Sequence, residues 1–175
     1  MIRTCIEADM QATTEIYRHH VLHGLASFET EPPSLADMCH RHADVLGKGL
    51  PYLVADVDGM IAGYAYAGTY RPRAAYRDTV ENSVYLRHDM AGRGIGRQLL
   101  GALIRECEAR DLRQMIAVIG DSANIASIRL HERCGFRHAG TLHNVGFKHG
   151  KWLDSVLMQR TLGAGETMAP GRRDD

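Results

Sequence analysis

Residues 84–109 read VYLRHDMAGRGIGRQLLGALIRECEA, and this stretch decides the fold. Its first three residues are typical of a strand, and a glycine-rich turn follows at residues 92–96. Apolar side chains then recur every three to five residues, at Ile95, Leu99, Leu100, Leu103, Ile104 and Cys107. Because this spacing places them on one side of a helix, the stretch predicts a strand, a turn and an amphipathic helix in direct succession.

The glycine-rich turn has the composition of a phosphate-binding loop. Glycines at alternate positions let the backbone approach a ligand closely, and the free N–H groups at the start of a helix attract anions. Arg93 and Arg97 add positive charge at the rim. The turn therefore predicts a site for a pyrophosphate-bearing cofactor, although on its own it fits an ordinary core-packing helix equally well.

A second segment, residues 124–136, reads NIASIRLHERCGF and decides between these readings. Together the two segments resemble the GNAT N-acetyltransferase superfamily, in which a strand, a (Gln/Arg)xxGx(Gly/Ala) turn and a helix bind acetyl-CoA. Gly94 and Gly96 match the turn, and matches to the later motif are Asn124, Leu130, Gly135 and Phe136. The chain departs from the pattern at Ala91, where Gln or Arg is usual, and at His131, where many members carry Tyr.

The His at this position belongs to a narrower resemblance, to the phosphinothricin and methionine sulfoximine N-acetyltransferases. This likeness rests on residues 81–85 (ENSVY), 146–152 (GFKHGKW), 28–32 (FETEP), 54–67 and 117–120, and it spans most of residues 2–162. It implies an α/β (α+β) class with a single GNAT domain over residues 1–162, a mixed and mostly antiparallel sheet flanked by helices, and a homodimer with the substrate pocket near the subunit contact. Residues 163–175 have no apolar period and are expected to form a flexible tail.

Composition narrows the possible partners. The 175 residues are the size of one domain, and 21 basic residues balance 21 acidic ones, which argues against nucleic acid as the main partner. No apolar run approaches the ~18 residues of a membrane span, and residues 1–4 lack the apolar core of a signal peptide, so a cytoplasmic protein is expected. The four cysteines are far apart and the ten histidines show no recognised zinc spacing, so free thiols and no metal are expected.

The remaining elements follow from local patterns. A strand is expected at residues 2–5, helices at 8–21 and from Ser34 to about Gly47, and strands at 79–86 and 115–119. Strands at 52–57 and 60–67 are joined by Asp58 and Gly59, a dipeptide that favours a two-residue hairpin turn. Ser34 with Asp37 three residues later is a near capping box.

Acetyl transfer to an amine needs a proton acceptor, because amines are mostly protonated near neutral pH. On a strand, Glu81 shares a face with Ser83 and Tyr85. From spacing alone Glu81 fits a solvated carboxylate, but phosphinothricin-type acetyltransferases carry a Glu in this context as general base, and the resemblance gives Glu81 that role.

His131 has two readings as well. Its helical spacing from Ile128 and Cys134 fits a half-buried packing residue. By resemblance it stands where the superfamily uses Tyr to protonate the departing CoA thiolate, and an imidazole can donate that proton near neutral pH. The backbone N–H of Leu86 is the expected donor to the thioester carbonyl.

The resemblance also implies the binding residues. The cofactor is expected at Val84, Tyr85, Leu86, Gly92, Arg93, Gly94, Ile95, Gly96, Arg97 and Asn124, and the substrate at Phe28, Tyr66, Arg71, Arg73, Asn82, Ser83 and Tyr85. Arg71 or Arg73 could bind a carboxylate bidentately, yet both also fit a solvated basic loop. The expected substrate is the free amine of phosphinothricin, methionine sulfoximine or methionine sulfone, without a preference among them.

Three alternatives stay open. A dinucleotide-dependent oxidoreductase would need a third glycine where the chain has Leu99. A non-catalytic acyl-CoA-binding sensor would share the cofactor loop but has no reason to keep both Glu81 and His131. Acetylation of a protein or peptide N-terminus is the chief competitor among enzymes.

Overall fold

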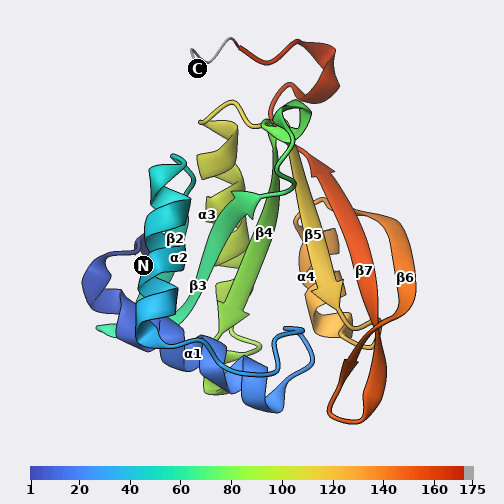
Figure 1. The fold of residues 1–175 in the computed structure, drawn as a ribbon. Coiled ribbons are helices and arrows are strands. Elements are labelled where there is room, and N and C mark those ends of the chain that lie inside the picture. The colour runs from blue at the N-terminus through green and yellow to red at the C-terminus, as the bar shows by residue number, and fades with distance from the viewer. Residues whose placement is uncertain (172–175) are drawn as a thin grey trace.

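One seven-stranded sheet, in the order β1-β2-β3-β4-β5-β7-β6, organises the computed structural model, which describes residues 1–171 (Figure 1). The strands are β1 (Ile2–Thr4), β2 (Tyr52–Val57), β3 (Met60–Thr69), β4 (Thr79–Leu86), β5 (Gln114–Gly120), β6 (Arg137–Lys148) and β7 (Lys151–Thr161). The α-helices are α1 (Met10–His23), α2 (Leu35–Gly47), α3 (Ile95–Glu108) and α4 (Ile125–Arg133). Short 3-10 turns are η1 (Glu7–Asp9), η2 (Ala74–Tyr76), η3 (His88–Met90) and η4 (Gly165–Thr167). The predicted mixed, mostly antiparallel sheet flanked by helices is confirmed.

Two local predictions are confirmed in detail. Asp58 and Gly59 both have positive φ, 52° and 82°, and close the β2–β3 hairpin with Val57 opposite Met60. At the start of α2, Ser34 accepts a hydrogen bond from the Asp37 N–H, and Asp37 accepts one from the Ser34 N–H, which completes the capping box.

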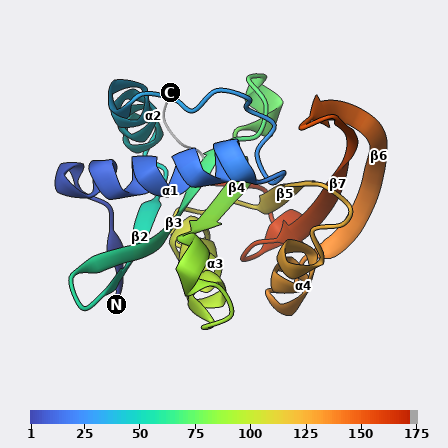
Figure 2. The same ribbon diagram turned by 90° about the horizontal axis from the view of Figure 1, so that it is seen from below.

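The helices cover both faces of the sheet (Figure 2). On one face α1 and α2 pack against a core that includes Val21, Val54 and Tyr64, and on the other α3 packs against a core that includes Leu99, Leu103 and Met115. No helix within residues 1–171 is both long and apolar enough to cross a membrane.

The sheet is interrupted at its centre. β4 and β5 run parallel and pair only from Thr79 opposite Gln114 to Asn82 opposite Ala117. Beyond these residues β4 stays paired with β3 as far as Leu86, and β5 stays paired with β7 as far as Gly120. The two strands therefore separate toward their carboxyl ends, as Figure 1 shows in the lower half of the sheet.

The last third of the sheet has no strand predicted from local sequence patterns. β6 and β7 form a long hairpin whose register shifts between His138 and Gly140 and again between Leu142 and Gly146. These irregularities break the alternation of apolar and polar residues that reveals a strand in a sequence.

The segment after β7 is anchored over the part that the structure describes. Residues 165–167 form η4, the Arg113 guanidinium donates to the Ala169 carbonyl, and the Gly171 N–H donates to the Asp111 carboxylate. Ala169 and Gly171 thus contact the loop before β5 through backbone groups, which need no apolar period, and the flexible tail stays a prediction. The rest of that expectation, residues 172–175, lies outside the described residues.

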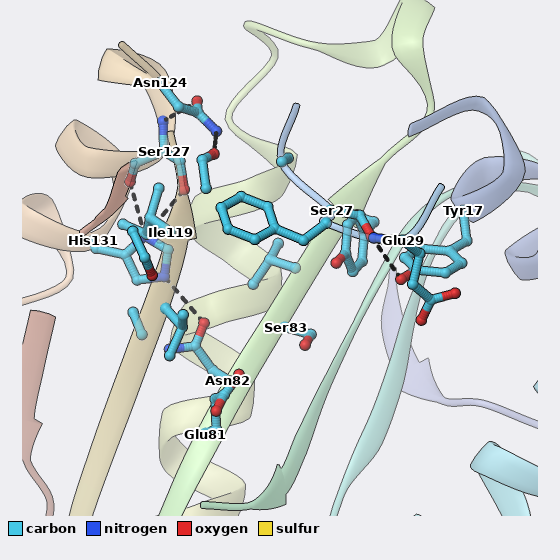
Figure 3. Close-up of a pocket in the computed structure, with 18 residues that line it drawn as sticks. Tyr17, Ser27, Glu29, Glu81, Asn82, Ser83, Ile119, Asn124, Ser127 and His131 are labelled. Atoms are coloured by element: carbon cyan, nitrogen blue, oxygen red, sulfur yellow. Dashed lines mark hydrogen bonds between the residues drawn. The ribbon is translucent and has the colours of Figure 1, made fainter. Parts of the chain in front are cut away.

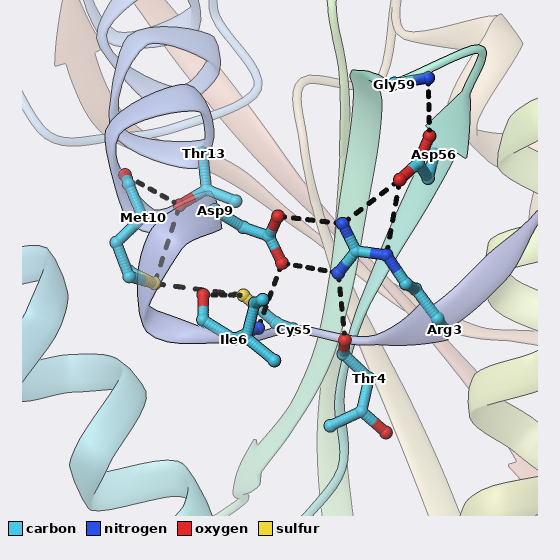
Figure 4. Close-up of polar contacts among 9 residues, drawn as sticks. All are labelled: Arg3, Thr4, Cys5, Ile6, Asp9, Met10, Thr13, Asp56 and Gly59. Atoms are coloured by element: carbon cyan, nitrogen blue, oxygen red, sulfur yellow. Dashed lines mark hydrogen bonds and ion pairs between the residues drawn. The ribbon is translucent and has the colours of Figure 1, made fainter.

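A charged cluster ties β1 to the start of α1 (Figure 4). The Arg3 guanidinium donates to both carboxylate oxygens of Asp9, at 2.6 and 2.9 Å, and to Asp56 at 3.1 Å. Asp9 also accepts the Ile6 N–H at 2.9 Å, and its side chain is 7% exposed. The hydrogen bond from Arg3 is the main reason that the pKa of Asp9 lies below its ordinary value.

Replacing Asp9 by Asn should lower the free energy of unfolding at pH 7 by about 1–3 kcal/mol, because it removes the charge of a largely buried carboxylate that accepts two hydrogen bonds from Arg3. Asp9 has its lowered pKa only in the folded state, so its contribution is complete above an unfolded-state pKa of about 3.9 and is lost as pH falls through the folded-state pKa. Urea unfolding of Asp9→Asn and of the parent should therefore converge in strong acid. Asp44→Asn, which breaks an exposed pair with Lys48, is the matched control and should change little.

Candidate active site

A cavity of about 530 Å³ lies where β4 and β5 separate (Figure 3). It is lined by residues 81–85 of β4, residues 117–120 of β5, residues 26–29 of the loop after α1, and Asn124, Ser127 and His131 at and within α4, together with Tyr17 and Ser155. Residues far apart in the sequence thus meet in one space, and they include both predicted catalytic residues.

Backbone donors face this opening. The Arg87 N–H donates to the Ala62 carbonyl, so the odd-numbered residues of β4 direct their backbone groups toward β3. Val84 and Leu86 consequently direct theirs toward the opposite edge, where β5 has moved away. The Leu86 carbonyl on that edge is bound by His20 Nε2 on α1 at 2.7 Å, which leaves the Val84 and Leu86 N–H groups for a ligand.

The glycine turn leads directly into α3 and is open to solvent. Gly92 and Gly94 each have φ of 78°, and a Cβ added to either would meet no atom within 4 Å. Gly94 is the N-cap of α3, so no side chain caps the first N–H groups of this 14-residue helix. Arg93 and Arg97 are exposed beside it. An empty space facing free donors and positive charge fits a pyrophosphate.

Gly96 has a different reason to be glycine than the one expected from the sequence. It is buried, and a Cβ there would lie 3.3 Å from the Leu130 side chain and 3.5 Å from that of Leu86. Its small size lets α3 pack closely against α4 and the end of β4, while its backbone N–H still belongs to the uncapped first turn of α3.

Asn124 links β5 to α4. Its side-chain oxygen accepts the Ser127 N–H at 3.2 Å as the N-cap of α4, and its Nδ2 donates to the Gly120 carbonyl at 3.1 Å. The structure thus places this predicted cofactor residue on the cavity wall, with both ends of its amide already bonded within the chain.

Glu81 points into the cavity from β4 (Figure 3). Its side chain makes no hydrogen bond or ion pair with any residue of the described part, and burial raises its pKa above the ordinary value. A half-buried carboxylate without a partner is unfavourable for folding alone, which is typical of a functional group.

His131 enters the same cavity from the other face of the sheet. Glu81 is an odd-numbered residue of β4, whereas Asn82, with which His131 makes contact, lies on the face covered by α3 and α4. His131 Nδ1 lies 2.8 Å from the Ser127 carbonyl and Nε2 lies 3.0 Å from Asn82 Oδ1. Burial acts to lower the pKa of this ring, whereas the hydrogen bond to the Ser127 carbonyl acts to raise it. Because β4 and β5 stop pairing after Asn82 and Ala117, side chains from both faces of the sheet line one cavity.

The predicted substrate residues divide into two groups. Phe28, Asn82, Ser83 and Tyr85 line the cavity. Tyr66, on β3 opposite Ser83, is not part of the lining and stacks on Tyr52 at 5.0 Å between ring centroids. Asn82 donates its Nδ2 to the Ile116 carbonyl at 3.2 Å and presents its Oδ1 to His131, so its amide is already engaged.

The structure does not bring Arg71 and Arg73 to the cavity. Both are exposed in the loop before β4, and the Arg71 guanidinium lies over the Tyr70 ring at 5.2 Å. This placement has a geometric reason: the loop enters the amino end of β4, while the strands separate at the carboxyl end (Figure 1). The substrate role of Arg71 and Arg73 stays a prediction.

Sequence reasoning missed the residues that hold the loop over the cavity. The Tyr17 hydroxyl lies 2.9 Å from Ser27 Oγ, and Lys148 Nζ on β6, 4% exposed, donates to the Ser27 carbonyl at 2.8 Å. The Phe28 ring packs on Gly120 and Gly146, where an added Cβ would lie only 2.7 and 2.5 Å from it. A lone lysine in a polar run and one serine carry no signal of such contacts, since they depend on tertiary structure.

Comparison with known proteins agrees with this geometry. Residues 2–157 match the model of the acetyltransferase (GNAT) domain. The chain belongs to the GNAT acetyltransferase family. This confirms the resemblance seen in the sequence and the class of activity, acetyl-CoA-dependent acetyl transfer.

Individual relatives of this GNAT chain have narrower names. The chain is 55% identical over 169 residues to a phosphinothricin N-acetyltransferase of Alcaligenes faecalis, covering 97% of this chain and 86% of the relative. It is 42% identical over 162 residues to an L-methionine sulfoximine/L-methionine sulfone acetyltransferase of Pseudomonas aeruginosa, covering 92% and 94%. A phosphinothricin acetyltransferase of Sinorhizobium meliloti, solved in complex with acetyl-CoA, superposes with a TM-score of 0.95 at 46% identity, covering 98% of this chain and 92% of that one.

Replacing Gly94 by Ala should weaken acetyl-CoA binding, measured by calorimetry, by about tenfold or more, because the new methyl group enters the space before the α3 N-terminus and left-handed backbone strains a non-glycine residue by about 1–2 kcal/mol. Gly49→Ala is the matched control: Gly49 also has positive φ, 69°, with nothing within 4 Å of an added Cβ, but it lies after α2. It should lose similar stability and keep its affinity for acetyl-CoA. Equal affinities for the two variants would show that the turn does not hold the cofactor.

Proposed function

We propose that this chain transfers the acetyl group of acetyl-CoA to the free amine of a small amino-acid analogue such as phosphinothricin, methionine sulfoximine or methionine sulfone. The observation that carries the proposal is the partnerless Glu81 carboxylate in the cavity that opens between β4 and β5. The names of the relatives support the substrate class.

The cofactor would enter from the α3 end. Its pyrophosphate would bind the N–H groups that follow Gly94, and the pantetheine arm would run along the free edge of β4 beside Val84 and Leu86. The Leu86 N–H then lies where it can bind the thioester oxygen and stabilise the negative charge that develops on it.

The amine would approach from the Glu81 side. Burial raises the pKa of Glu81, which makes its carboxylate a stronger base than an exposed one, and it can take a proton from the incoming ammonium group directly or through water. The nitrogen attacks the thioester carbon, the carbon–sulfur bond breaks, and the thiolate takes a proton for which His131 is the proposed donor.

The substrate itself would lie between the loop at residues 26–29 and β4. Phe28 and Tyr85 form apolar walls, and Ser83 adds a hydroxyl on the face of Glu81. A cavity of about 530 Å³ suits an amino-acid analogue together with the end of the cofactor arm, which favours a small molecule over a folded protein substrate.

We also propose a homodimer, as expected from the sequence resemblance. Large apolar side chains stay exposed on the β6–β7 hairpin, at Leu142, Val145, Phe147 and Trp152. This surface adjoins Gly146, on which Phe28 packs at the cavity. Light scattering should give twice the 19.4 kDa of one chain, and Trp152→Lys should reduce that mass; a parent mass of one chain would contradict the dimer.

The cytoplasmic location stays a prediction.

Release of free CoA thiol tests the activity. With acetyl-CoA and a panel of phosphinothricin, methionine sulfoximine, methionine sulfone, ordinary amino acids, polyamines and peptides, we expect thiol release with the three analogues. Glu81→Gln should lower kcat by about 10²- to 10⁴-fold, because it removes the general base. The parent kcat/KM should fall as pH decreases through the raised pKa of Glu81, since only the carboxylate accepts a proton.

Glu132→Gln is the control, because Glu132 is exposed on α4. It should turn over like the parent. Thiol release only with peptides would favour the N-terminal acetyltransferase, and stabilisation by acetyl-CoA without any turnover would favour the non-catalytic sensor.

A further inference from the structure

Both ring nitrogens of His131 face hydrogen-bond acceptors. Nδ1 lies 2.8 Å from the carbonyl oxygen of Ser127, one turn earlier on α4. A carbonyl oxygen can only accept, so Nδ1 must carry a hydrogen. The state of the ring therefore depends on what faces Nε2.

The group facing Nε2 is the side-chain oxygen of Asn82, at 3.0 Å. The amide of Asn82 is fixed in this orientation by its other end, because Nδ2 donates to the Ile116 carbonyl at 3.2 Å. Turning the amide over would place its oxygen against that carbonyl, which would cost a hydrogen bond and add a repulsion. Nε2 must consequently carry a hydrogen as well.

Within residues 1–171, no charged group accounts for this arrangement. From β4 the neighbouring group is the neutral Asn82, with Glu81 on the opposite face of the strand, and from β5 it is the Ile116 backbone. The Phe136 ring lies edge-on at 5.0 Å, and Glu132 on α4 is exposed. Burial, with only 4% of His131 exposed, opposes a charge on the ring. Two neutral oxygens at hydrogen-bond distance oppose the loss of the positive charge, because a neutral ring would direct a nitrogen lone pair at one of these oxygens.

We propose that Asn82 is a positioning residue that holds His131 doubly protonated, so that the imidazolium stores the proton that the departing thiolate needs. This inference rests on the proposed function. When the carbon–sulfur bond breaks, the Nε2–H bond breaks and an S–H bond forms, and the N–H electron pair stays on Nε2. The neutral ring then regains a proton from solvent, with Asn82 Oδ1 again as its acceptor.

The direct test is a pH titration of the ring nitrogens by NMR in the full chain labelled with ¹⁵N-histidine. The His131 signals are identified by their loss in His131→Gln. At pH 7 without substrate, we expect both ring nitrogens to show the shifts of N–H groups, because the two facing oxygens outweigh the burial that acts to lower the pKa of the ring. A ring with one deprotonated nitrogen at pH 7 would overturn the proposal. This readout does not require turnover, so it is independent of whether the substrate proposal holds.

Two variants of Asn82 should act in opposite directions. Asn82→Asp places a negative charge next to Nε2 and favours the imidazolium. The pH at which kcat falls on the alkaline side should therefore rise by about one pH unit or more. Asn82→Leu removes the acceptor, so the pH at which kcat falls should decrease. At pH 7, kcat should fall by about tenfold or more, with little change in KM for acetyl-CoA. A merely structural role would shift neither profile, or both alike, and either result would contradict the proposal.

The double variant gives the control. Asn82→Leu should have no further effect on kcat in the His131→Gln background, because Asn82 acts through His131. Melting curves of each variant show whether it is folded. If Asn82→Leu does not fold, the parent titration and the Asn82→Asp profile still decide the question.

Discussion

The separation of β4 from β5 is the constraint on which the rest of the structure depends. A parallel pair that stops at Asn82 and Ala117 leaves backbone donors of Val84 and Leu86 unpaired in the middle of a sheet. Backbone N–H groups without acceptors are unfavourable inside a protein, so the hydrogen bonds of this edge of β4 are complete only when a ligand with acceptors lies along it. The glycine turn and the start of α3 extend the same set of free donors, and we propose that together they bind the cofactor from its pyrophosphate to its acyl group.

Several contacts keep the strands apart. The end of β4 is held by β3 through the Arg87 N–H and by α1 through His20 at the Leu86 carbonyl. β5 is held by β7 along its whole length and is joined to α4 through Asn124. Because each strand has its own partners, the opening does not depend on a ligand to hold it, and groups from both faces of the sheet reach one cavity.

Much of this fold could be predicted from the sequence, because its signals are local. The Asp58–Gly59 hairpin, the Ser34 capping box and the α3 periodicity depend on neighbours within a few residues. The side on which Glu81, Ser83 and Tyr85 lie also follows from strand alternation. What the sequence could not show depends on long-range geometry. Arg71 and Arg73 are close to Glu81 in sequence but do not line the cavity that Glu81 enters, and Lys148 reaches Ser27 across 121 positions. Gly96 looked like part of the phosphate loop, and only the packing of Leu130 and Leu86 shows its other role.

Amide hydrogen exchange measured residue by residue with and without acetyl-CoA tests the central claim most directly. We expect the N–H groups of Val84 and Leu86, and those of residues 95–97, to exchange more slowly when the cofactor is bound, because they gain acceptors. Those of Ser83 and Tyr85, which face β3, should be unchanged. Unchanged exchange at Val84 and Leu86, with protection elsewhere in the described chain, would contradict a cofactor bound along the open edge of β4.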